Sequence, residues 1–212
     1  MKLQLALDEL PLDEALALTE KLRQYVDIIE IGTPFVIAEG MNAVRIFRQH
    51  FPEKEILSDE KIMDGGYFES KLAFDAGANY VTALGVTDIL TVKACLRASE
   101  EAGRDLVIVI DMICVDDLPT RIRELEAAGV KHLAVHTGAD QQAAGRQPIE
   151  DLKVMKQHVS HSRISVAGGI NSNTIGQYVA LNPDVIIVGS AITRAKDPIE
   201  EARLIKTAMQ GL

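Results

Sequence analysis

Short apolar runs alternate along this chain with longer amphipathic segments. Eight of these runs predict strands, at residues 3–7, 28–31, 55–58, 80–84, 106–110, 132–135, 163–166 and 185–188. The segments between them carry apolar residues at helical spacing, most clearly at residues 12–25 and at residues 118–128, where Gly129 follows. Strands that alternate with helices in this way indicate βα units and a parallel sheet.

The number of units favours a closed barrel. Eight units in 212 residues correspond to roughly 26 residues each, which suits a compact (β/α)8 barrel with few insertions. An open doubly wound sheet is the alternative, but it usually has fewer strands and a glycine-rich turn after the first one. Here the first strand runs into Asp8-Glu9-Leu10-Pro11. We therefore predict an α/β protein with one (β/α)8 TIM-barrel domain over residues 1–212.

Composition and charge narrow the class further. The formal net charge is -9, which disfavours a nucleic-acid surface because such surfaces need basic patches. No apolar run approaches the roughly 18 residues that a membrane-spanning helix needs, and the first residues reach Asp8 too early for a signal peptide. Cys95 and Cys114 lack metal-site spacing and suit reduced thiols. We expect a cytoplasmic protein without nucleic-acid or membrane partners.

The most informative motif spans residues 59–64, where two acids flank a lysine in the order D-x-K-x-x-D. It follows the predicted strand at residues 55–58, and the period of two along a strand puts Asp59 and Lys61 on one face and Glu60 on the other. Because burying such charges costs desolvation energy, we interpret the motif as a metal-binding or proton-transfer cluster. A structural salt-bridge cluster is the alternative.

Polar residues also end several other predicted strands. In a TIM barrel the active site lies at the C-terminal ends of the strands. The barrel would therefore bring four carboxylates, a lysine and a histidine to one mouth: Asp8, Glu30, Asp59, Lys61, Asp111 and His136. Any one of them alone would more often cap a strand end, but their joint placement predicts an active site.

Glycine-containing turns follow the last two strands. Gly168 and Gly169 follow the seventh strand, Gly189 and Ser190 follow the eighth, and each pair precedes a predicted helix start. Glycines let a backbone approach a ligand closely, and helix N-termini present free N–H groups to anions. The loops after strands seven and eight are a frequent phosphate site in these barrels. We therefore predict a substrate of sugar-phosphate size.

Several segments together resemble one enzyme family. They are residues 5–8, 30–34, 59–66, 111–113, 136–138, 167–170 and 188–193, so the similarity runs essentially from end to end. On these segments the chain resembles the 3-hexulose-6-phosphate synthases of the orotidine-monophosphate decarboxylase superfamily, which also holds the 3-keto-L-gulonate-6-phosphate decarboxylases. Those decarboxylases typically have Glu where Asp111 stands and Arg where Ser190 stands, so both positions favour the synthase. Glu60 departs from the small or apolar residue usual at its position.

The resemblance implies an aldehyde-lyase that catalyses a reversible, Mg²⁺-dependent aldol condensation of formaldehyde with D-ribulose 5-phosphate. The product would be D-arabino-hex-3-ulose 6-phosphate, formed through an enediolate. Glu30 and Asp59 would bind Mg²⁺, for which Mn²⁺ can substitute, and Lys61 would place positive charge near the enediolate oxygens. His136 is the expected general acid/base, because an imidazole titrates near neutral pH.

The resemblance assigns the remaining roles as well. Asp8 would hold substrate hydroxyls, and Asp64 would complete the Lys61 network. If His136 is not the base, Asp111 and Asp64 are the next candidates. In the superfamily the second aspartate of the motif reaches into the neighbouring subunit's site, which implies an obligate homodimer with shared active sites. Two alternatives stay open: a decarboxylase that acts on a 3-keto-L-gulonate 6-phosphate-like acid through the same enediolate, and a non-catalytic sugar-phosphate sensor.

Overall fold

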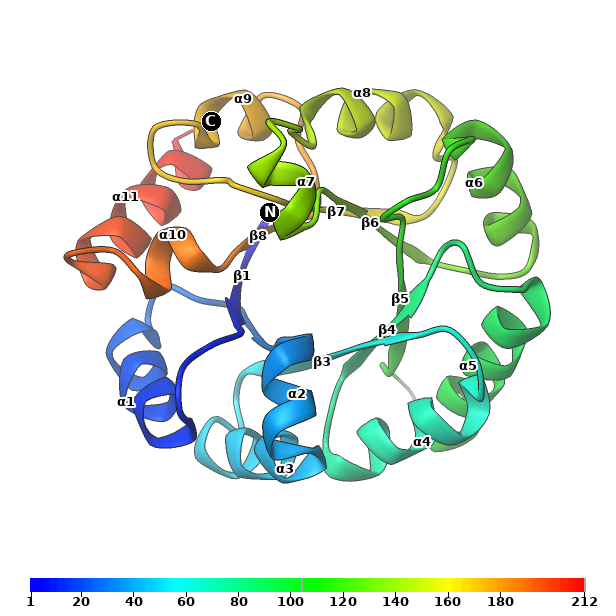
Figure 1. Cartoon of the computed structure of the whole chain (residues 1–212), viewed down its shortest axis with the longest axis horizontal. Coiled ribbons are helices and arrows are strands. Elements are labelled where there is room, and N and C mark those ends of the chain that lie inside the picture. Colours follow the sequence, from blue (N-terminus) through cyan, green and yellow to red (C-terminus); the bar gives the residue numbers. More distant parts are fainter. Residues whose placement is uncertain (104, 212) are drawn as a thin grey trace.

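The strands close into a parallel barrel. In the computed structural model, which describes residues 1–103 and 105–211, eight strands pair in chain order and the last pairs with the first (Figure 1). They are β1 (Lys2–Leu7), β2 (Ile28–Ile31), β3 (Glu55–Ile62), β4 (Tyr80–Leu84), β5 (Val107–Asp111), β6 (His132–His136), β7 (Arg163–Ala167) and β8 (Val185–Val188). The predicted (β/α)8 TIM barrel is confirmed.

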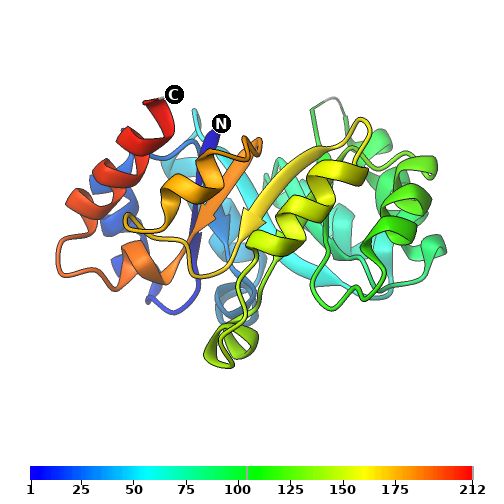
Figure 2. The ribbon, with the colours of Figure 1, turned by 90° about the horizontal axis from the view of Figure 1, so that it is seen from above.

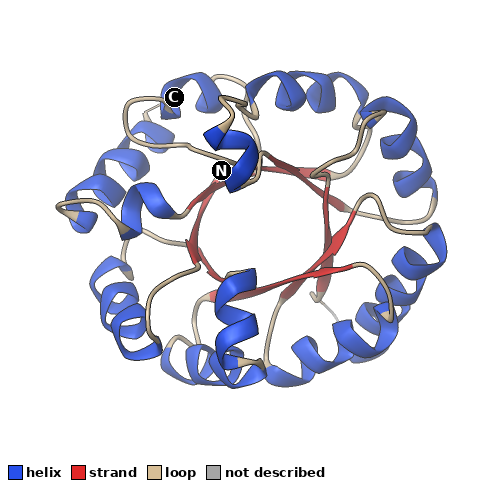
Figure 3. Cartoon of the chain, in the orientation of Figure 1, coloured by secondary structure: helices blue, strands red, loops and turns tan. Residues whose placement is uncertain are grey.

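Helices connect the strands and surround the barrel (Figure 3). They are α1 (Leu12–Leu22), α2 (Thr33–Glu39), α3 (Met41–His50), α4 (Gly66–Ala76), α5 (Ile89–Ala102), α6 (Leu118–Ala127), α7 (Ala139–Ala143), α8 (Ile149–His158), α9 (Ile175–Val179), α10 (Ser190–Thr193) and α11 (Pro198–Gln210). Figure 2 shows α2 and α7 projecting beyond one end of the barrel, while both chain termini lie at the other end. Among the described helices, none is long and apolar enough to cross a membrane.

The strand containing the lysine motif is longer than predicted. The apolar pattern ends at Ser58, but β3 continues to Ile62. Two features explain the extension: the Lys61 N–H donates a hydrogen bond to Thr82 Oγ1 at 2.9 Å, and the register with β4 shifts between Ser58 and Ile62. Lys61 itself has a φ of 49°. The irregular segment therefore stays in the sheet although its residues are charged.

The other element bounds are close to those predicted. Strands at residues 28–31, 80–84 and 185–188 have the predicted bounds, and the remaining four differ by one residue at one or both ends. The helix predicted at residues 12–25 ends early, at Leu22, because Tyr25 N–H donates to the Leu22 carbonyl at 2.8 Å and turns the chain toward β2.

An apolar layer fills the middle of the barrel. Side chains alternate along each strand, so Leu57 faces the interior whereas Ile56 belongs to the larger core that includes residues of the surrounding helices. The interior layer consists of Ile28, Leu57, Tyr80, Val109, Ala134 and Val185. It separates the two ends of the barrel, and each end carries its own polar residues.

Candidate active site

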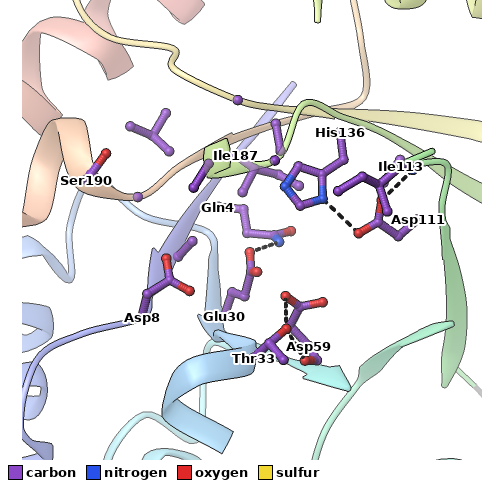
Figure 4. Close-up of a pocket in the computed structure, with 18 of the residues that line it drawn as sticks. Gln4, Asp8, Glu30, Thr33, Asp59, Asp111, Ile113, His136, Ile187 and Ser190 are labelled. Carbon is purple, nitrogen blue, oxygen red and sulfur yellow. Dashed lines mark hydrogen bonds and ion pairs between the residues drawn. The ribbon is translucent and has the colours of Figure 1, made fainter. Parts of the chain in front are cut away.

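A cavity of about 770 Å³ opens at the C-terminal ends of the strands (Figure 4). The six charged or titratable residues that the sequence places at strand ends all line it: Asp8, Glu30, Asp59, Lys61, Asp111 and His136. They come from β2, β3, β5, β6 and the residue that follows β1. The fold thus brings together the side chains that the sequence places at one mouth.

Asp59 accepts several hydrogen bonds in this cavity. Its Oδ1 accepts one from Thr82 Oγ1 at 2.7 Å, and its Oδ2 accepts one from Thr33 Oγ1 at 2.8 Å. The Lys61 ammonium also pairs with Oδ2. Burial by itself would raise the pKa of this carboxyl, but the Lys61 charge and the hydrogen bonds outweigh burial and lower the pKa. Asp59 is therefore ionised at neutral pH.

Lys61 lies between two carboxylates. Besides its contact with Asp59, its Nζ lies 3.6 Å from Asp111 Oδ2. Burial disfavours the charged form of the lysine, yet the charges of Asp59 and Asp111 outweigh burial and raise its pKa. The side chain is thus a fixed positive charge rather than a nucleophilic free amine.

Asp111 connects Lys61 to His136. Its Oδ2 lies 2.8 Å from His136 Nδ1, and its Oδ1 accepts a hydrogen bond from the Ile113 N–H at 3.0 Å. Because an ionised carboxylate only accepts, the imidazole Nδ1 carries the hydrogen. In the neutral ring Nε2 then has a free lone pair, so the geometry equips His136 to take a proton from a ligand in the cavity.

Glu30 is a buried acid on β2. Gln4 Nε2 donates to Glu30 Oε2 at 2.6 Å. Burial, together with the nearby charge of Asp59, raises the pKa of Glu30 to about 8. Burial and the charge of Asp59 also raise the pKa of Asp8. The charge of Asp59 therefore disfavours the ionisation of both Glu30 and Asp8, and a further cation among these acids would relieve the repulsion.

These acids fit a divalent ion that prefers oxygen ligands. Figure 4 shows the carboxylates of Glu30 and Asp59 close together on one side of the cavity. Among the described residues, no three His, Cys, Asp or Glu side chains are grouped closely enough to hold a metal by themselves. Mg²⁺ commonly takes one or two carboxylates and completes its shell with water and substrate oxygens. Two protein ligands suit that ion.

The glycine turns form another part of the cavity wall, lined by Gly168, Gly169, Gly189 and Ser190. Gly168 and Gly169 have φ values of 128° and 66°, a backbone that other residues rarely adopt. A Cβ on Gly169 would lie 3.1 Å from Gln142 Oε1. The backbone N–H groups here can therefore approach a ligand without intervening side chains.

The helix predicted directly after Gly169 is not there. Helix α10 does begin at Ser190, right after Gly189, but α9 begins only at Ile175. Asn171 explains the delay, because its Oδ1 accepts hydrogen bonds from the N–H groups of Asn173 at 2.9 Å and Thr174 at 3.2 Å. Such local side-chain bonds compete with helix formation.

Two acids of the motif lie away from the cavity. Asp64 is exposed, and its carboxylate accepts a hydrogen bond from the Gly65 N–H at 2.7 Å. No ion pair joins it to Lys61 in the described part of the chain, so Asp64 does not complete the Lys61 network within one chain. Glu60 accepts a hydrogen bond from the Ser58 hydroxyl, and burial raises the pKa of its carboxyl. As alternation predicts, Glu60 does not line the cavity.

Three polar residues in contact with the acids had no role assigned from the sequence. Gln4 and Thr82 lie inside strands, where their neighbours are apolar, and Thr33 begins α2. A polar residue at an inward-facing strand position is a signal for such a role, because a buried polar group needs a partner. That signal could have identified Gln4 and Thr82.

Comparisons with known proteins show which family this chain belongs to. A family model described as Orotidine 5'-phosphate decarboxylase / HUMPS family matches residues 1–205. The chain is 44% identical over 212 residues to a Staphylococcus haemolyticus protein named 3-hexulose-6-phosphate synthase, with 100% of each covered. The crystal structure of 3-hexulose-6-phosphate synthase from Salmonella typhimurium is 60% identical, with a TM-score of 0.98, over 100% of this chain and 99% of that one.

A more distant structure represents the other activity considered above. The 3-keto-L-gulonate-6-phosphate decarboxylase from Vibrio cholerae is 28% identical, with a TM-score of 0.85, over 99% of this chain and 97% of that one. The barrel is thus shared by both kinds of protein, while sequence identity is higher to the synthases.

Proposed function

Since this chain belongs to the Orotidine 5'-phosphate decarboxylase / HUMPS family, we propose that it is an enzyme that reversibly condenses formaldehyde with D-ribulose 5-phosphate to D-arabino-hex-3-ulose 6-phosphate. Relatives named 3-hexulose-6-phosphate synthase that match its full length support this activity. The observation that carries the proposal is the series Lys61, Asp111 and His136, which sets a proton acceptor beside a fixed positive charge.

The reaction begins with the loss of a proton next to a ketone. His136 Nε2 takes the proton from C1 of ribulose 5-phosphate, and the electrons of the C–H bond move toward the ketone oxygen to give an enediolate. C1 then attacks the carbon of formaldehyde, and the formaldehyde oxygen takes up a proton from the His136 imidazolium, which regenerates the base. Asp111 holds the ring with Nε2 free and stabilises the imidazolium that forms. No other reactant is consumed.

Lys61 stabilises the negative charge that this step creates. A protonated amine in a partly buried site acts on a nearby oxyanion more strongly than it would in water. Because Asp59 and Asp111 hold the lysine protonated, a Schiff base with the ketone is not part of the proposal. Asp8 is proposed to accept hydrogen bonds from substrate hydroxyls.

Glu30 and Asp59 are the proposed ligands of Mg²⁺, with Mn²⁺ able to replace it. When bound, the ion would stabilise negative charge on substrate oxygen as a Lewis acid. Gln4 bonds Glu30, and Thr33 and Thr82 bond Asp59, so both carboxylates are oriented before any ligand arrives. The charge of Asp59 helps to raise the pKa of Glu30, and this repulsion between the two carboxylates supports their assignment as metal ligands.

The phosphate group is proposed to bind the glycine turns, at Gly168, Gly169, Gly189 and Ser190. Their open backbone offers N–H donors, and the Ser190 side chain adds a hydroxyl. Arg194 also lines the cavity, where its guanidinium pairs with Glu9. The cavity volume of about 770 Å³ is large enough for a sugar phosphate.

We also propose a homodimer with shared sites, because apolar residues are exposed around Asp64. Phe68 and Leu72 on α4 are 75% and 59% exposed, and Leu90 on α5 is 71% exposed. Helices α4 and α5 lie next to each other (Figure 1), and the exposed Met63 directly precedes Asp64. Exposed apolar groups of this kind commonly mark protein interfaces. A second chain bound here would bring its own Asp64 to the interface.

Sedimentation of a charged variant tests the dimer. Leu72→Glu should yield monomers and lose most activity, whereas Lys71→Glu, at the neighbouring exposed position, should remain dimeric. A fully active monomer would refute the shared site.

Two unpaired cysteines support a cytoplasmic location. Cys95 is buried and Cys114 exposed, and neither forms a disulfide. Reduced thiols are the rule in reducing compartments.

A paired assay tests the activity itself. Purified protein with Mg²⁺ receives either ribulose 5-phosphate and formaldehyde, scored for formaldehyde loss, or 3-keto-L-gulonate 6-phosphate, scored for CO₂ release. Formaldehyde loss that depends on ribulose 5-phosphate and is lost in His136→Ala is the expected result. CO₂ release without formaldehyde loss would instead identify a decarboxylase. If the protein shows neither formaldehyde loss nor CO₂ release, the enzyme assignment is refuted.

A further inference from the structure

A second cavity, of about 410 Å³, lies at the opposite end of the barrel. Six of its lining residues are the first residues of their strands: Lys2, Glu55, Tyr80, Val107, His132 and Arg163. Asp105 and Lys131 complete the lining. The apolar interior layer lies between this cavity and the candidate active site. One contact links the two cavities, because His132 bonds Ser165, which lines the candidate active-site cavity. No residue that lines the second cavity has a role in the chemistry proposed above.

The side chains that line this cavity include three cations, Lys2, Lys131 and Arg163, and two acids, Glu55 and Asp105. Glu55 is already neutralised, since one of its oxygens pairs with Lys2 and the other accepts a hydrogen bond from Tyr80 Oη at 3.1 Å. Lys131 and Arg163 have no ion pair with any described residue. Among the residues that line the cavity, Asp105 is the one remaining acid for these two cations, and outside the lining the charge of Asp184 also acts on His132.

His132 adds a buried polar atom without a partner. Its side chain lines the cavity but is 3% exposed, and its Nε2 lies 2.6 Å from Ser165 Oγ. Its Nδ1 is buried and has no hydrogen-bond partner among the described residues. Such an atom costs free energy unless something pairs with it. When Ser165 donates its hydroxyl hydrogen to Nε2, Nδ1 of the neutral ring carries the other hydrogen and needs an acceptor.

We propose that this cavity is a binding site for a small oxyanion, a phosphate group in particular, with Arg163 and Lys131 as its charged partners and His132 Nδ1–H as a further donor. Arginine and lysine are the side chains that proteins most often use for phosphate. The phosphate can belong to the free inorganic ion or to the ester of a small organic molecule, because the cavity opens to solvent at the strand starts.

Histidine NMR signals test the proposal and separate the two cavities. The chain has 5 histidines, of which His132 reports on this cavity and His136 on the candidate active site. Inorganic phosphate is titrated against the full-length protein, with sodium chloride at matched ionic strength as the reference. The His132 signal, assigned with His132→Gln, should shift with saturation in phosphate and stay in place in chloride.

Substitutions identify the residues responsible. Arg163→Met and Lys131→Met remove exposed charges and keep side-chain length, so both variants should fold. Each should weaken the phosphate response of His132 by roughly tenfold or more, the effect of losing a hydrogen bond to a charged group. Arg45→Met, at an exposed position on α3, is the matched control and should leave the response unchanged. The His136 response should be the same in all of these proteins.

The His132 signal can support or refute phosphate binding at the second cavity. A weaker His132 response to phosphate in both Arg163→Met and Lys131→Met supports the site. If glycerol 3-phosphate then binds the wild type as tightly as inorganic phosphate does, the site takes a phosphate ester. If the His132 signal responds to inorganic phosphate alone, the site takes the free ion. A His132 signal that never moves would mean that only water pairs with Nδ1 and would overturn the proposal. So would an equal response to chloride, or an affinity unchanged in both variants. None of these results depends on whether formaldehyde is a substrate.

Discussion

Glu126, far from either cavity, provides a sharp test of how this fold is stabilised. It lies on α6, and its carboxylate accepts hydrogen bonds from three successive backbone N–H groups after α8: Ser160 at 3.1 Å, His161 at 3.0 Å and Ser162 at 2.9 Å. Its side chain is only 7% exposed, so water cannot replace these donors. We predict that Glu126→Gln, which keeps the shape and removes the charge, destabilises the protein.

The magnitude follows from the pKa of this carboxyl. Burial would raise the pKa, but the N–H groups of His161 and Ser162 outweigh burial and lower it to about 2, from 4.5 in a free side chain. At 1.36 kcal/mol per pKa unit, this difference corresponds to about 3 kcal/mol of stability from ionisation. The unfolded chain binds the proton more tightly, so this contribution is complete above about pH 4.5 and is lost as the pH falls toward 2.

Urea unfolding followed by circular dichroism measures both effects. At pH 7 the Gln variant should have a free energy of unfolding lower by about 1–3 kcal/mol, because the amide oxygen keeps part of the hydrogen bonding. Between pH 4.5 and pH 3 the wild type should lose stability more steeply than the variant. Glu100→Gln, at an exposed position on α5, is the control and should match the wild type. Equal stability at pH 7 and parallel pH curves for Glu126→Gln would refute the reasoning.

Three further predictions concern the candidate active site. With ribulose 5-phosphate alone, His136→Ala should slow exchange of the C1 proton with solvent deuterium, measured by NMR, by roughly 10²–10⁴-fold; an unchanged rate would move the base to another residue. Glu30→Gln should lower the affinity for Mn²⁺ in electron paramagnetic resonance titrations, and unchanged affinity would remove Glu30 from the ligand set. Gly169→Val should raise KM for the sugar phosphate more than it lowers kcat, because a side chain there meets Gln142 and strains a backbone with a φ of 66°; a normal KM would place the phosphate elsewhere.

The sequence was most informative where one physical rule governs many residues. The regular alternation of strands and helices predicts the barrel, and the barrel then places every strand's C-terminal end at one mouth. This is why Asp8 and His136, far apart in the chain, could both be expected to line one cavity.

Features that depend on single contacts could not be predicted. The extension of β3 to Ile62 rests on the Lys61–Thr82 hydrogen bond and on an irregular register, and neither leaves a trace in the apolar pattern. The loop before α9 likewise depends on the Asn171 side chain. The cavity at the strand starts was missed for a different reason, because its residues lie one per strand and form no motif along the chain.

The outward position of Asp64 has a genetic consequence. Its carboxylate lies outside the cavity of its own chain, so in the proposed dimer each site would combine His136 of one chain with the partner's Asp64. Two defective alleles, one encoding Asp64→Asn and one encoding His136→Ala, would then complement each other when expressed together. Random pairing would give each mixed dimer one intact site, restoring about a quarter of the wild-type sites. Neither allele alone would support growth that depends on this enzyme, and the cell carrying both would.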